Sequence, residues 1–455
     1  MADRMGARAA IAALTTEFEE LTSGTGAADD TGDGPLSWAG YADSRARATA
    51  RTGEDESVVH GLASLGGRHC VLVSFEFGFL GGSLGQRTGD RLVAAYEAAR
   101  RRGLPLVSLI ATGGSRMQEG MVALTQLQRV ARASARLRAA GPAQLAVLRD
   151  PTTGGGWATL GAGADVILAL PGAQVGFAGS RVRPPDSDPH AYSAEGQLAA
   201  GQIDAVVPPE ELPGTVAHWL RALHAPKTPD GPDAPVPPAP VPDALSVTGL
   251  PATGWDAVQQ ARSAARPRAE AYLDAYFDHR LPLVGDRCGG TDPGLLCGFG
   301  RREGRSIAYA AQCGTATLPA GYRTAARVIR LAGRLGVPVL TLIDTPGAAN
   351  DAAAERAGAG AAIADAFTAV AEAPVPVTTL VIGEGGSGGA LALAAPGNTH
   401  VTRDSYFSVI APELAAAILK RAPDEVRATA DQLRLRPQDL VELGFARSVV
   451  GPPQE

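Results

Sequence analysis

The sequence has little of several features that mark common protein classes. It contains four cysteines, and because none forms a Cys-x-x-Cys pair, neither a zinc ribbon nor a disulfide framework is indicated. Its seven histidines show no His-x-His or His-Glu-x-x-His spacing, so we expect no metal site. Lysine occurs only as Lys227 and Lys420, and neither follows the glycine-rich context of a Walker phosphate loop, which excludes that loop.

Long apolar runs and a strong charge of one sign are also missing. No stretch of 18 apolar residues occurs, so we expect no membrane span. The formal net charge of −6 gives no sign of a nucleic-acid surface. The N-terminal segment carries Glu17, Glu19 and Glu20 and lacks a clean apolar run followed by a cleavage site. We therefore expect an unprocessed cytoplasmic protein with no nucleic-acid or membrane partner.

What is present is typical of a globular enzyme with several domains. The chain has 455 residues, of which 45% are hydrophobic, and this allows two or three domains. Residues 224–243 are rich in proline and have no apolar periodicity, which is typical of a semi-extended linker. We expect a flexible N-terminus over 1–37, a first domain over 38–223 and a second domain over 244–455.

The two sides of the linker resemble each other. The segments "GLPLVSLIATGG" (103–114) and "GVPVLTLIDTPG" (336–347) are identical at six of twelve positions, at an offset of 233 residues. The same offset aligns Gly155–Gly156 with Gly388–Gly389. An ungapped correspondence of this length indicates two copies of one domain. In each copy, strand-like runs such as "CVLVSFEF" alternate with helical ones such as "GDRLVAAYEAARRRG", which predicts an α/β fold.

The stretch "VIGEGGSGGALALA", which begins at Val381, matches two unrelated motifs. One is the dinucleotide fingerprint Gly-x-Gly-x-x-Gly, starting at Gly383, with Asp404 at the distance of a ribose-binding acid. That fingerprint normally opens a βαβ unit, whereas this one lies late in its repeat. The other is the Gly-x-Ser-x-Gly nucleophile elbow around Ser387, with a second match at Gly81–Gly85.

The repeat argues against serine chemistry at these turns. Ser387 aligns with Gly154, and Ser83 aligns with Ala316, so the copies share glycines and not the serine. A glycine turn before a helix lets main-chain N–H groups converge, and the helix start adds its positive dipole end. This arrangement predicts an oxyanion-binding device. Tight packing of strand on helix is the alternative explanation for such glycines.

Taken together, these segments resemble a known family. The stretches "WAGYADSRARATARTGEDESVVHG", "FEFGFLGGSLG" and "ATGGSRMQEG" resemble the β subunit of the bacterial acetyl-CoA carboxylase carboxyltransferase. The stretches "WDAVQQARSAARPR", "GDR", "GYRTAARVIRLAGRLGVPVLTLIDTPGA" and "VIGEGGSGGALAL" resemble its α subunit. The resemblance starts near residue 38 and implies a β–α fusion with two tandem crotonase-like β-β-α spiral domains.

Three departures from the family leave the acyl substrate open. The four-cysteine zinc ribbon that often begins the β subunit is missing. The segment 176–207 is shorter and richer in proline than usual. At 344–351 the sequence "DTPGAAND" replaces the family's "DTPGAYPG", with loss of an aromatic residue and a proline.

The resemblance implies transfer of a carboxyl group from carboxybiotin to the α-carbon of an acyl-CoA, most simply acetyl-CoA giving malonyl-CoA. Negative charge develops on the thioester oxygen and on the ureido oxygen of biotin. Each needs preorganised donors, which contribute about 3–4 kcal/mol apiece in known oxyanion holes. In this family the biotin anion takes the α-proton, so no protein base is expected, and no metal is expected.

Motif matching also implies which residues act. We expect four catalytic glycines, with Gly113 and Gly114 at the thioester oxygen and Gly388 and Gly389 at biotin. Arg116 is expected to bind a substrate carboxylate or the CoA phosphates, or alternatively to form a salt bridge at the start of a helix. Further substrate contacts are assigned to Gly81, Gly82, Gly385 and Gly386.

The resemblance extends to partners and rivals. In the family the active site forms between the N-terminal copy of one protomer and the C-terminal copy of another, so we expect a homodimer or larger homo-oligomer. A biotin carboxylase and a biotin carboxyl carrier protein are the expected partners. The alternatives are an enzyme of the same fold that decarboxylates malonyl thioesters or carboxylates a carrier-bound intermediate of secondary metabolism, and a catalytically silent scaffold that docks carboxylase components.

Overall fold

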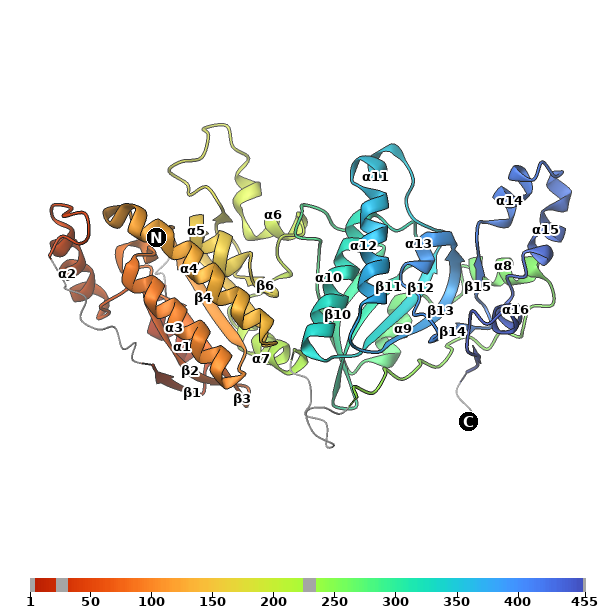
Figure 1. Ribbon diagram of the computed structural model, residues 1–455, viewed down its shortest axis with the longest axis horizontal. Helices are drawn as coiled ribbons and strands as arrows, with labels where there is room; N and C mark the ends of the chain where they lie inside the picture. The colour runs from red at the N-terminus through yellow and green to blue at the C-terminus, as the bar shows by residue number, and fades with distance from the viewer. Residues whose placement is uncertain (1–4, 22–31, 224–234, 453–455) are drawn as a thin grey trace. The chain divides into compact units, whose positions relative to one another are not determined.

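The computed structural model describes residues 5–21, 32–223 and 235–452 (Figure 1). The chain divides into two compact units, Met1–Arg221 and Ala222–Glu455. Each unit is built on a sheet of eight strands. Within the described parts of the chain, no helix combines the length and the apolar character needed to cross a bilayer.

The first unit orders its sheet as β1-β2-β3-β4-β5-β6-β8, with β7 paired to β5. The β1, β2 and β3 strands pair antiparallel, and the strands from β3 to β8 pair parallel. Its elements are α1 (Ala7–Leu14), β1 (Glu17–Glu20), α2 (Tyr41–Thr52), β2 (Val58–Leu65), β3 (Arg68–Phe75), η1 (Leu80–Gly82), α3 (Gln86–Arg102), β4 (Leu106–Thr112), η2 (Met117–Glu119), α4 (Gly120–Ala139), β5 (Gln144–Thr153), α5 (Gly154–Gly156), η3 (Trp157–Gly161), β6 (Val166–Ala169), β7 (Val175–Gly176), η4 (Pro189–Tyr192), α6 (Ala194–Ala199), β8 (Ala205–Val206) and α7 (Leu212–Ala222).

The second unit orders its sheet as β9-β10-β11-β12-β13-β14-β16, with β15 paired to β13. Here β9, β10 and β11 pair antiparallel and the remaining strands pair parallel. Its elements are α8 (Gly254–Arg262), α9 (Ala269–Tyr276), β9 (His279–Pro282), β10 (Leu295–Arg302), β11 (Arg305–Gln312), α10 (Pro319–Leu335), β12 (Val339–Thr345), α11 (Ala352–Arg356), α12 (Ala359–Ala371), β13 (Val377–Gly386), α13 (Ser387–Leu391), β14 (Thr399–Thr402), β15 (Tyr406–Ser408), α14 (Pro412–Ile418), η5 (Pro423–Glu425), α15 (Val426–Gln432), α16 (Pro437–Glu442) and β16 (Val449–Val450).

The repeat predicted from sequence is present in three dimensions. Helix α3 matches α10, and strands β4, β5 and β6 match β12, β13 and β14, with both ends of each pair displaced by the same number of residues. Leu106, which begins β4, thus corresponds to Val339, which begins β12, an offset of 233. The two sheets also have the same strand order along this correspondence. Each unit therefore places its strand-end turns at equivalent points of one fold.

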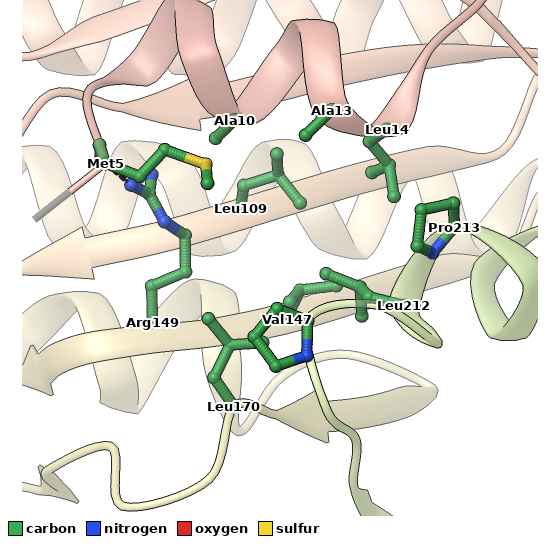
Figure 2. A pocket seen from close by; sticks show the side chains of 11 residues that line it. Met5, Ala10, Ala13, Leu14, Leu109, Val147, Arg149, Leu170, Leu212 and Pro213 are labelled. Carbon is green, nitrogen blue, oxygen red and sulfur yellow. Dashed lines mark hydrogen bonds between the residues drawn. The ribbon is translucent and has the colours of Figure 1, made fainter.

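Side chains alternate between the two faces of the sheet along the central strands of the first unit. Ile110 and Leu148 pack with Leu92 and Tyr96 of α3 in the main core. Their neighbours in sequence point to the opposite face, because side chains alternate along a strand. On that face, Leu109 and other apolar side chains line a small cavity of about 60 Å³ beneath α1, and Arg149 is the one charged residue among those that line it (Figure 2).

Helix α1 and strand β1 fall inside the segment 1–37 that the sequence suggested was flexible. The helix buries Ala7, Ala10, Ile11 and Leu14, which share one helical face. Strand β1 pairs antiparallel with β2 and extends the sheet. This apolar spacing is the signal that the sequence interpretation overlooked, and the expected flexibility is wrong for these two elements. Residues 22–31 lie outside the described residues.

The expected linker at 224–243 also differs in part. Residues 224–234 lie outside the described residues, whereas the remainder packs onto the second unit without forming a helix or strand. Ala239 is buried, and its carbonyl accepts a hydrogen bond from Thr378 Oγ1 at 2.9 Å. The carbonyl of Pro240 accepts one from the Tyr276 hydroxyl at 2.8 Å. A proline segment offers carbonyls but few N–H groups, so it can dock only where side chains supply the donors.

Candidate active site

In the first unit, the predicted glycine turn follows β4. Thr112 ends the strand, and its Oγ1 accepts the N–H of Gly114 at 3.1 Å. Gly114 has φ +108, a conformation that side chains with a Cβ rarely adopt. The carbonyl of Gly114 accepts the N–H of Leu84 at 2.9 Å, and the Arg116 N–H returns to the Leu84 carbonyl at 3.0 Å. The turn is thus pinned on both sides to one residue of a distant loop.

The second glycine turn of this unit faces the first. Gly154, with φ +62, directly follows β5 and begins α5. A Cβ built on Gly154 would lie 3.0 Å from the Gly114 Cα, and one built on Gly114 would lie 3.9 Å from the Gly155 nitrogen. The two main chains therefore lie against each other, and glycine is favoured at Gly154 by both space and its positive φ and at Gly114 by its positive φ.

The second unit repeats this geometry at the predicted offset. Gly347 has φ +141, and its N–H donates to Thr345 Oγ1 at 3.1 Å. Thr317 N–H donates to the Gly347 carbonyl at 3.1 Å, and Ala349 N–H returns to Thr317 at 2.9 Å. The facing turn runs from β13 into α13, and a Cβ built on Gly389 would lie 2.3 Å from the Ala348 nitrogen. Both units carry the same pair of facing turns.

The glycines around these turns divide into packed and open positions. A Cβ on Gly82 would lie 2.1 Å from the Ala111 carbonyl oxygen, one on Gly385 would lie 2.2 Å from the Phe407 ring, and one on Gly386 would lie 2.1 Å from the Pro346 carbonyl oxygen. These glycines are required by packing. The corresponding space at Gly388 and Gly81 holds nothing within 4 Å, so there the absence of a side chain leaves room for another molecule.

In the first unit, the N–H groups of the two predicted donors already have acceptors within the chain. The Gly113 N–H donates to the Gly81 carbonyl at 2.9 Å, and the Gly114 N–H is held by Thr112. An N–H group has one hydrogen, so these two glycines shape the turn instead of pointing their amides at a ligand. Within the residues described, no acceptor is found for the N–H groups of Ser115 and Gly155. Their equivalents in the second unit are Ala348 and Gly388, and the same holds for both.

The two motifs that overlap at Val381–Ala394 find structural explanations. A Cβ on Gly383 would lie 2.4 Å from Arg266 Nη2 and 2.3 Å from Asp344 Oδ1, so this glycine makes room for a buried ion pair. Asp404 is 3% exposed and is not available to a ribose. The dinucleotide interpretation is therefore unsupported by the geometry around its first glycine and its acid.

Ser387 adopts φ +58 at the strand-to-helix turn, the conformation expected of a nucleophile elbow. Its counterpart Gly154 has nearly the same φ, +62, without a side chain. The turn conformation thus belongs to the repeated fold, whichever residue occupies it.

We predict that Ser387→Gly retains the activity that the family resemblance implies within about threefold, and that removing the left-handed strain raises the free energy of unfolding by up to about 1 kcal/mol. Steady-state rates and urea unfolding measure the two effects. Loss of more than a hundredfold in rate from a folded variant would instead indicate serine chemistry.

Arg116 lies in a buried ion pair, which is the alternative that the sequence left open. Its side chain is 1% exposed, and its guanidinium contacts both oxygens of the fully buried Glu56. The same guanidinium donates to Glu119 Oε1 at 3.3 Å and to the Ser83 carbonyl at 2.8 Å. We conclude that Arg116 has no free donor to offer a substrate carboxylate in this arrangement.

The buried carboxylate of Glu56 depends on this partner. Burial by itself raises the pKa of Glu56, but the charge and hydrogen bonds of Arg116, with those of Ser57 and Thr88, outweigh it and lower that pKa to about 2. A depressed carboxyl pKa stabilises the fold above the unfolded-state pKa of about 4.3, and that contribution is lost as the pH falls toward 2.

We therefore expect the urea midpoint of the wild type to fall between about pH 4.5 and pH 2, and part of this fall to be missing in Glu56→Gln. Equilibrium unfolding at a series of pH values is the measurement. Parallel curves for the two proteins would show that Glu56 does not contribute to the acid sensitivity.

Two family models match the two halves of the chain. Residues 34–206 match the carboxyl transferase domain, and residues 250–455 match the acetyl co-enzyme A carboxylase carboxyltransferase-like family. Within the described residues, no group of three or more His, Cys, Asp or Glu side chains is placed to share a metal ion.

Two relatives match this chain over most of its length. The acetyl-coenzyme A carboxylase carboxyl transferase subunits beta/alpha of Salinispora arenicola is 39% identical over 431 residues, which covers 89% of this chain and 75% of that protein. The probable biotin-dependent acyl-coenzyme A carboxylase beta3 subunit of Mycobacterium bovis is 33% identical over 421 residues, which covers 90% of this chain and 83% of that one.

Among solved structures, the transcarboxylase 12S hexamer with methylmalonyl-coenzyme A and methylmalonic acid bound superposes with a TM-score of 0.80 at 22% identity, over 99% of this chain and 86% of that one. A single-chain, multi-domain long-chain acyl-CoA carboxylase superposes with a TM-score of 0.74 at 20% identity, over 99% of this chain and 46% of that one. The predicted pair of tandem crotonase-like domains is confirmed. The chain belongs to the acyl-CoA carboxylase carboxyltransferase family, as a fusion of β-type and α-type domains.

Proposed function

We propose that this chain transfers a carboxyl group from carboxybiotin, carried on a biotin carboxyl carrier protein, to the α-carbon of an acyl-CoA. The observation that supports this most is the duplicated pair of facing turns, in which main-chain N–H groups, those of Ser115 and Gly155 and of Ala348 and Gly388 among them, are left without an acceptor among the described residues. The reaction develops one anion on each reactant, and two such sites match two anions.

The first unit is assigned to the acyl thioester. The N–H groups of Ser115 and Gly155 would donate to the thioester oxygen as it becomes an enolate oxygen. Gly113 and Gly114, which the sequence suggested as the donors, would act by shaping the turn, and Gly82 by packing beneath it. Donors that are already held in place cost no reorganisation when the charge appears, which is why such sites accelerate reactions.

The second unit is assigned to biotin. The N–H groups of Ala348 and Gly388 would donate to the ureido oxygen of biotin as carbon dioxide leaves its ring nitrogen. Gly389, which the sequence suggested as a donor beside Gly388, stays a candidate donor, and it also packs closely against Ala348. Gly385 and Gly386 permit the close packing of this turn. The open space at Gly388 is where the biotin ring would lie against the main chain.

The proton of the acyl α-carbon needs an acceptor in this reaction. The turn sequences "TGGSR", "TGGG", "TPGAA" and "GGSGG" contain no histidine or carboxylate, so none of these turn residues can serve as the base. We assign proton acceptance to the biotin substrate once its carboxyl group has left. The role of this chain is then to hold the two reactants and to stabilise both anions.

Acetyl-CoA, giving malonyl-CoA, is the acyl substrate that we favour. The segment 176–207, which differs from the family, includes Phe177 as its second residue. The Phe177 carbonyl accepts the Gly154 N–H at 3.1 Å, and its side chain is 73% exposed. This segment therefore starts at the proposed thioester site and would line the acyl group. Its difference from relatives keeps open the decarboxylation of malonyl thioesters and the carboxylation of a carrier-bound intermediate.

Reverse transfer tests the function directly. The protein is incubated with malonyl-CoA, methylmalonyl-CoA or longer carboxyacyl-CoAs, with and without free biotin, and formation of the decarboxylated acyl-CoA is followed. We expect turnover that requires biotin and is fastest with malonyl-CoA. Turnover that is equal without biotin would favour the decarboxylase, and no turnover with unaltered carrier-protein binding would favour the scaffold.

A complete site also requires association between copies. We propose that the first unit of one copy works with the second unit of another, in a homodimer or larger assembly, and that a biotin carboxylase and a biotin carboxyl carrier protein supply the carboxyl group. Size-exclusion chromatography with light scattering measures the assembly. An active, strictly monomeric protein would contradict this part of the proposal.

A further inference from the structure

Each of the proposed anion sites is built over a buried arginine. In the first unit this is Arg116, which directly follows the turn, and in the second it is Arg266, which lies between α8 and α9. Both guanidinium groups are 1% exposed, and each pairs with a carboxylate that is 0% exposed. We refer to these as the Arg116 anchor and the Arg266 anchor.

The Arg116 anchor joins segments that are far apart in sequence. Its guanidinium uses all of its donors, on Glu56, on Glu119, on Ser83 and on the hydroxyl of Tyr41. Glu119 in turn accepts the Tyr41 hydroxyl at 2.6 Å. The contacts connect α2, the segment just before β2 and the loop before α3 to the turn. They therefore restrict the conformation of the turn.

The Arg266 anchor joins the ends of the two central strands. Its Nη2 contacts both oxygens of Asp344 at 2.9 Å, and its Nη1 contacts the Ile382 carbonyl. Asp344 precedes the turn that contains Gly347, and its Oδ1 accepts the Glu384 N–H at 3.1 Å. Arg266 therefore sets the spacing of β12 and β13 at the point where both facing turns begin.

Glycines next to the anchors make room for them. A Cβ on Gly85 would lie 2.7 Å from Arg116 Nη1, and a Cβ on Gly383 would lie 2.4 Å from Arg266 Nη2. These are the glycines that completed the elbow match at Gly81–Gly85 and opened the dinucleotide match. In both matches, therefore, a glycine is explained by the space that a buried arginine needs. Neither match requires a serine nucleophile or a bound pyrophosphate.

The repeat does not explain the two anchors. The position equivalent to Arg116 in the second copy is Ala349, and the position equivalent to Arg266 in the first is Asp33. The copies share the turns but hold them with different residues. Replacing a whole buried ion pair by apolar groups is often neutral for stability, whereas removing one partner is costly. The presence of such a pair is therefore better explained by the geometry that it gives to the turn than by its contribution to stability.

We propose that Arg116 and Arg266 are positioning residues, each for one reactant: Arg116 for the thioester and Arg266 for biotin. The inference rests on the proposed function. An amide displaced by even 1 Å loses most of its effect on a developing charge. Lysine is a suitable replacement because its single ammonium group cannot reproduce the planar guanidinium, which reaches two carboxylate oxygens and a main-chain carbonyl at once.

The test is the reverse reaction between malonyl-CoA and free biotin, with the KM of each substrate measured separately. Because the displaced amides would also hydrogen-bond the neutral oxygen of the bound substrate, we expect Arg266→Lys to lower kcat and to raise the KM for biotin at least about tenfold. The KM for malonyl-CoA should change less than about twofold. Arg116→Lys should give the opposite pattern. The surface arginine Arg330, which pairs with Asp365, supplies the control, and Arg330→Lys should leave both KM values unchanged.

Two multiple variants guard against a folding defect. Arg266→Met with Asp344→Leu leaves only Arg268, which also pairs with Asp344 and is partly exposed, without its partner. In the Arg116 anchor the buried Glu119 is neutralised too, as Arg116→Met with Glu56→Leu and Glu119→Gln, and circular dichroism establishes that both proteins are folded. They are expected to keep the same substrate-selective KM pattern. A merely structural role predicts a smaller active fraction with both KM values unchanged, and that result overturns the inference while the proposed function stands. A wild type that does not transfer carboxyl groups to biotin overturns both.

Discussion

A folded Gly388→Val protein is expected to lose at least about 100-fold in carboxyl transfer. A Cβ at this position meets nothing within 4 Å in the chain, so valine can be accommodated by the fold. The branched side chain would instead occupy the space in front of the Gly388 N–H, where we place the biotin ureido oxygen. Loss of one donor and displacement of the ring combine in the expected effect.

The matched control is Gly360→Val in α12. Gly360 also has open space around its Cα, and it lies in a helix of the same unit away from both turns. It should keep its stability or gain slightly, because valine is a better helix former than glycine, and it should keep its activity. Circular dichroism and thermal unfolding establish that both variants are folded. Full activity in a folded Gly388→Val protein would contradict the proposal that the turn at Gly388 binds biotin.

Gly114→Val is expected to abolish transfer through the first unit, again by at least about 100-fold. Two causes act together. The φ of +108 is strained for any residue with a Cβ, and the new side chain would reach the main chain of the facing Gly154 turn. The Ser115 N–H follows directly, so a shift of the turn moves the proposed donor.

Because Gly114 is buried, the control has to separate strain from function. Gly172 lies in the same unit with φ +68 and open space around it. Gly172→Val should therefore show a loss of stability from backbone strain, on the order of 1–2 kcal/mol, without a loss of rate per folded molecule. Equal rates for Gly114→Val and Gly172→Val, normalised to folded protein, would contradict the assignment of the first turn.

The two glycine variants also differ in which substrate they affect. Thermal shift with malonyl-CoA should be retained in Gly388→Val and reduced in Gly114→Val, because ligands stabilise only the folded state to which they bind. Retention or loss of the shift in both variants alike would argue against the division of labour between the units.

Much of the fold was accessible from the sequence. The matching segments at 103–114 and 336–347 revealed the repeat, and β4 and β12 have the same bounds at that offset. Strand and helix signals in this region are local, because apolar runs and glycine stops depend on neighbouring residues. Helix α1 also carried such a signal, in the apolar spacing of Ala7, Ala10, Ile11 and Leu14. It was missed because the composition of the segment 1–37 as a whole suggested a flexible N-terminus.

What the sequence by itself determined is the duplicated α/β domain, the turns at the ends of its strands and the family. Only the tertiary structure decided which amides in those turns have an acceptor, because the Gly113 N–H is taken by the carbonyl of Gly81 on a distant loop and the Gly114 N–H by the hydroxyl of Thr112 once the turn has formed. It also decided that Arg116 is an internal support, since its partner Glu56 lies 60 residues away in sequence. Hydrogen bonds and ion pairs between distant segments have no local signature, and their use becomes visible only once the chain has brought them together.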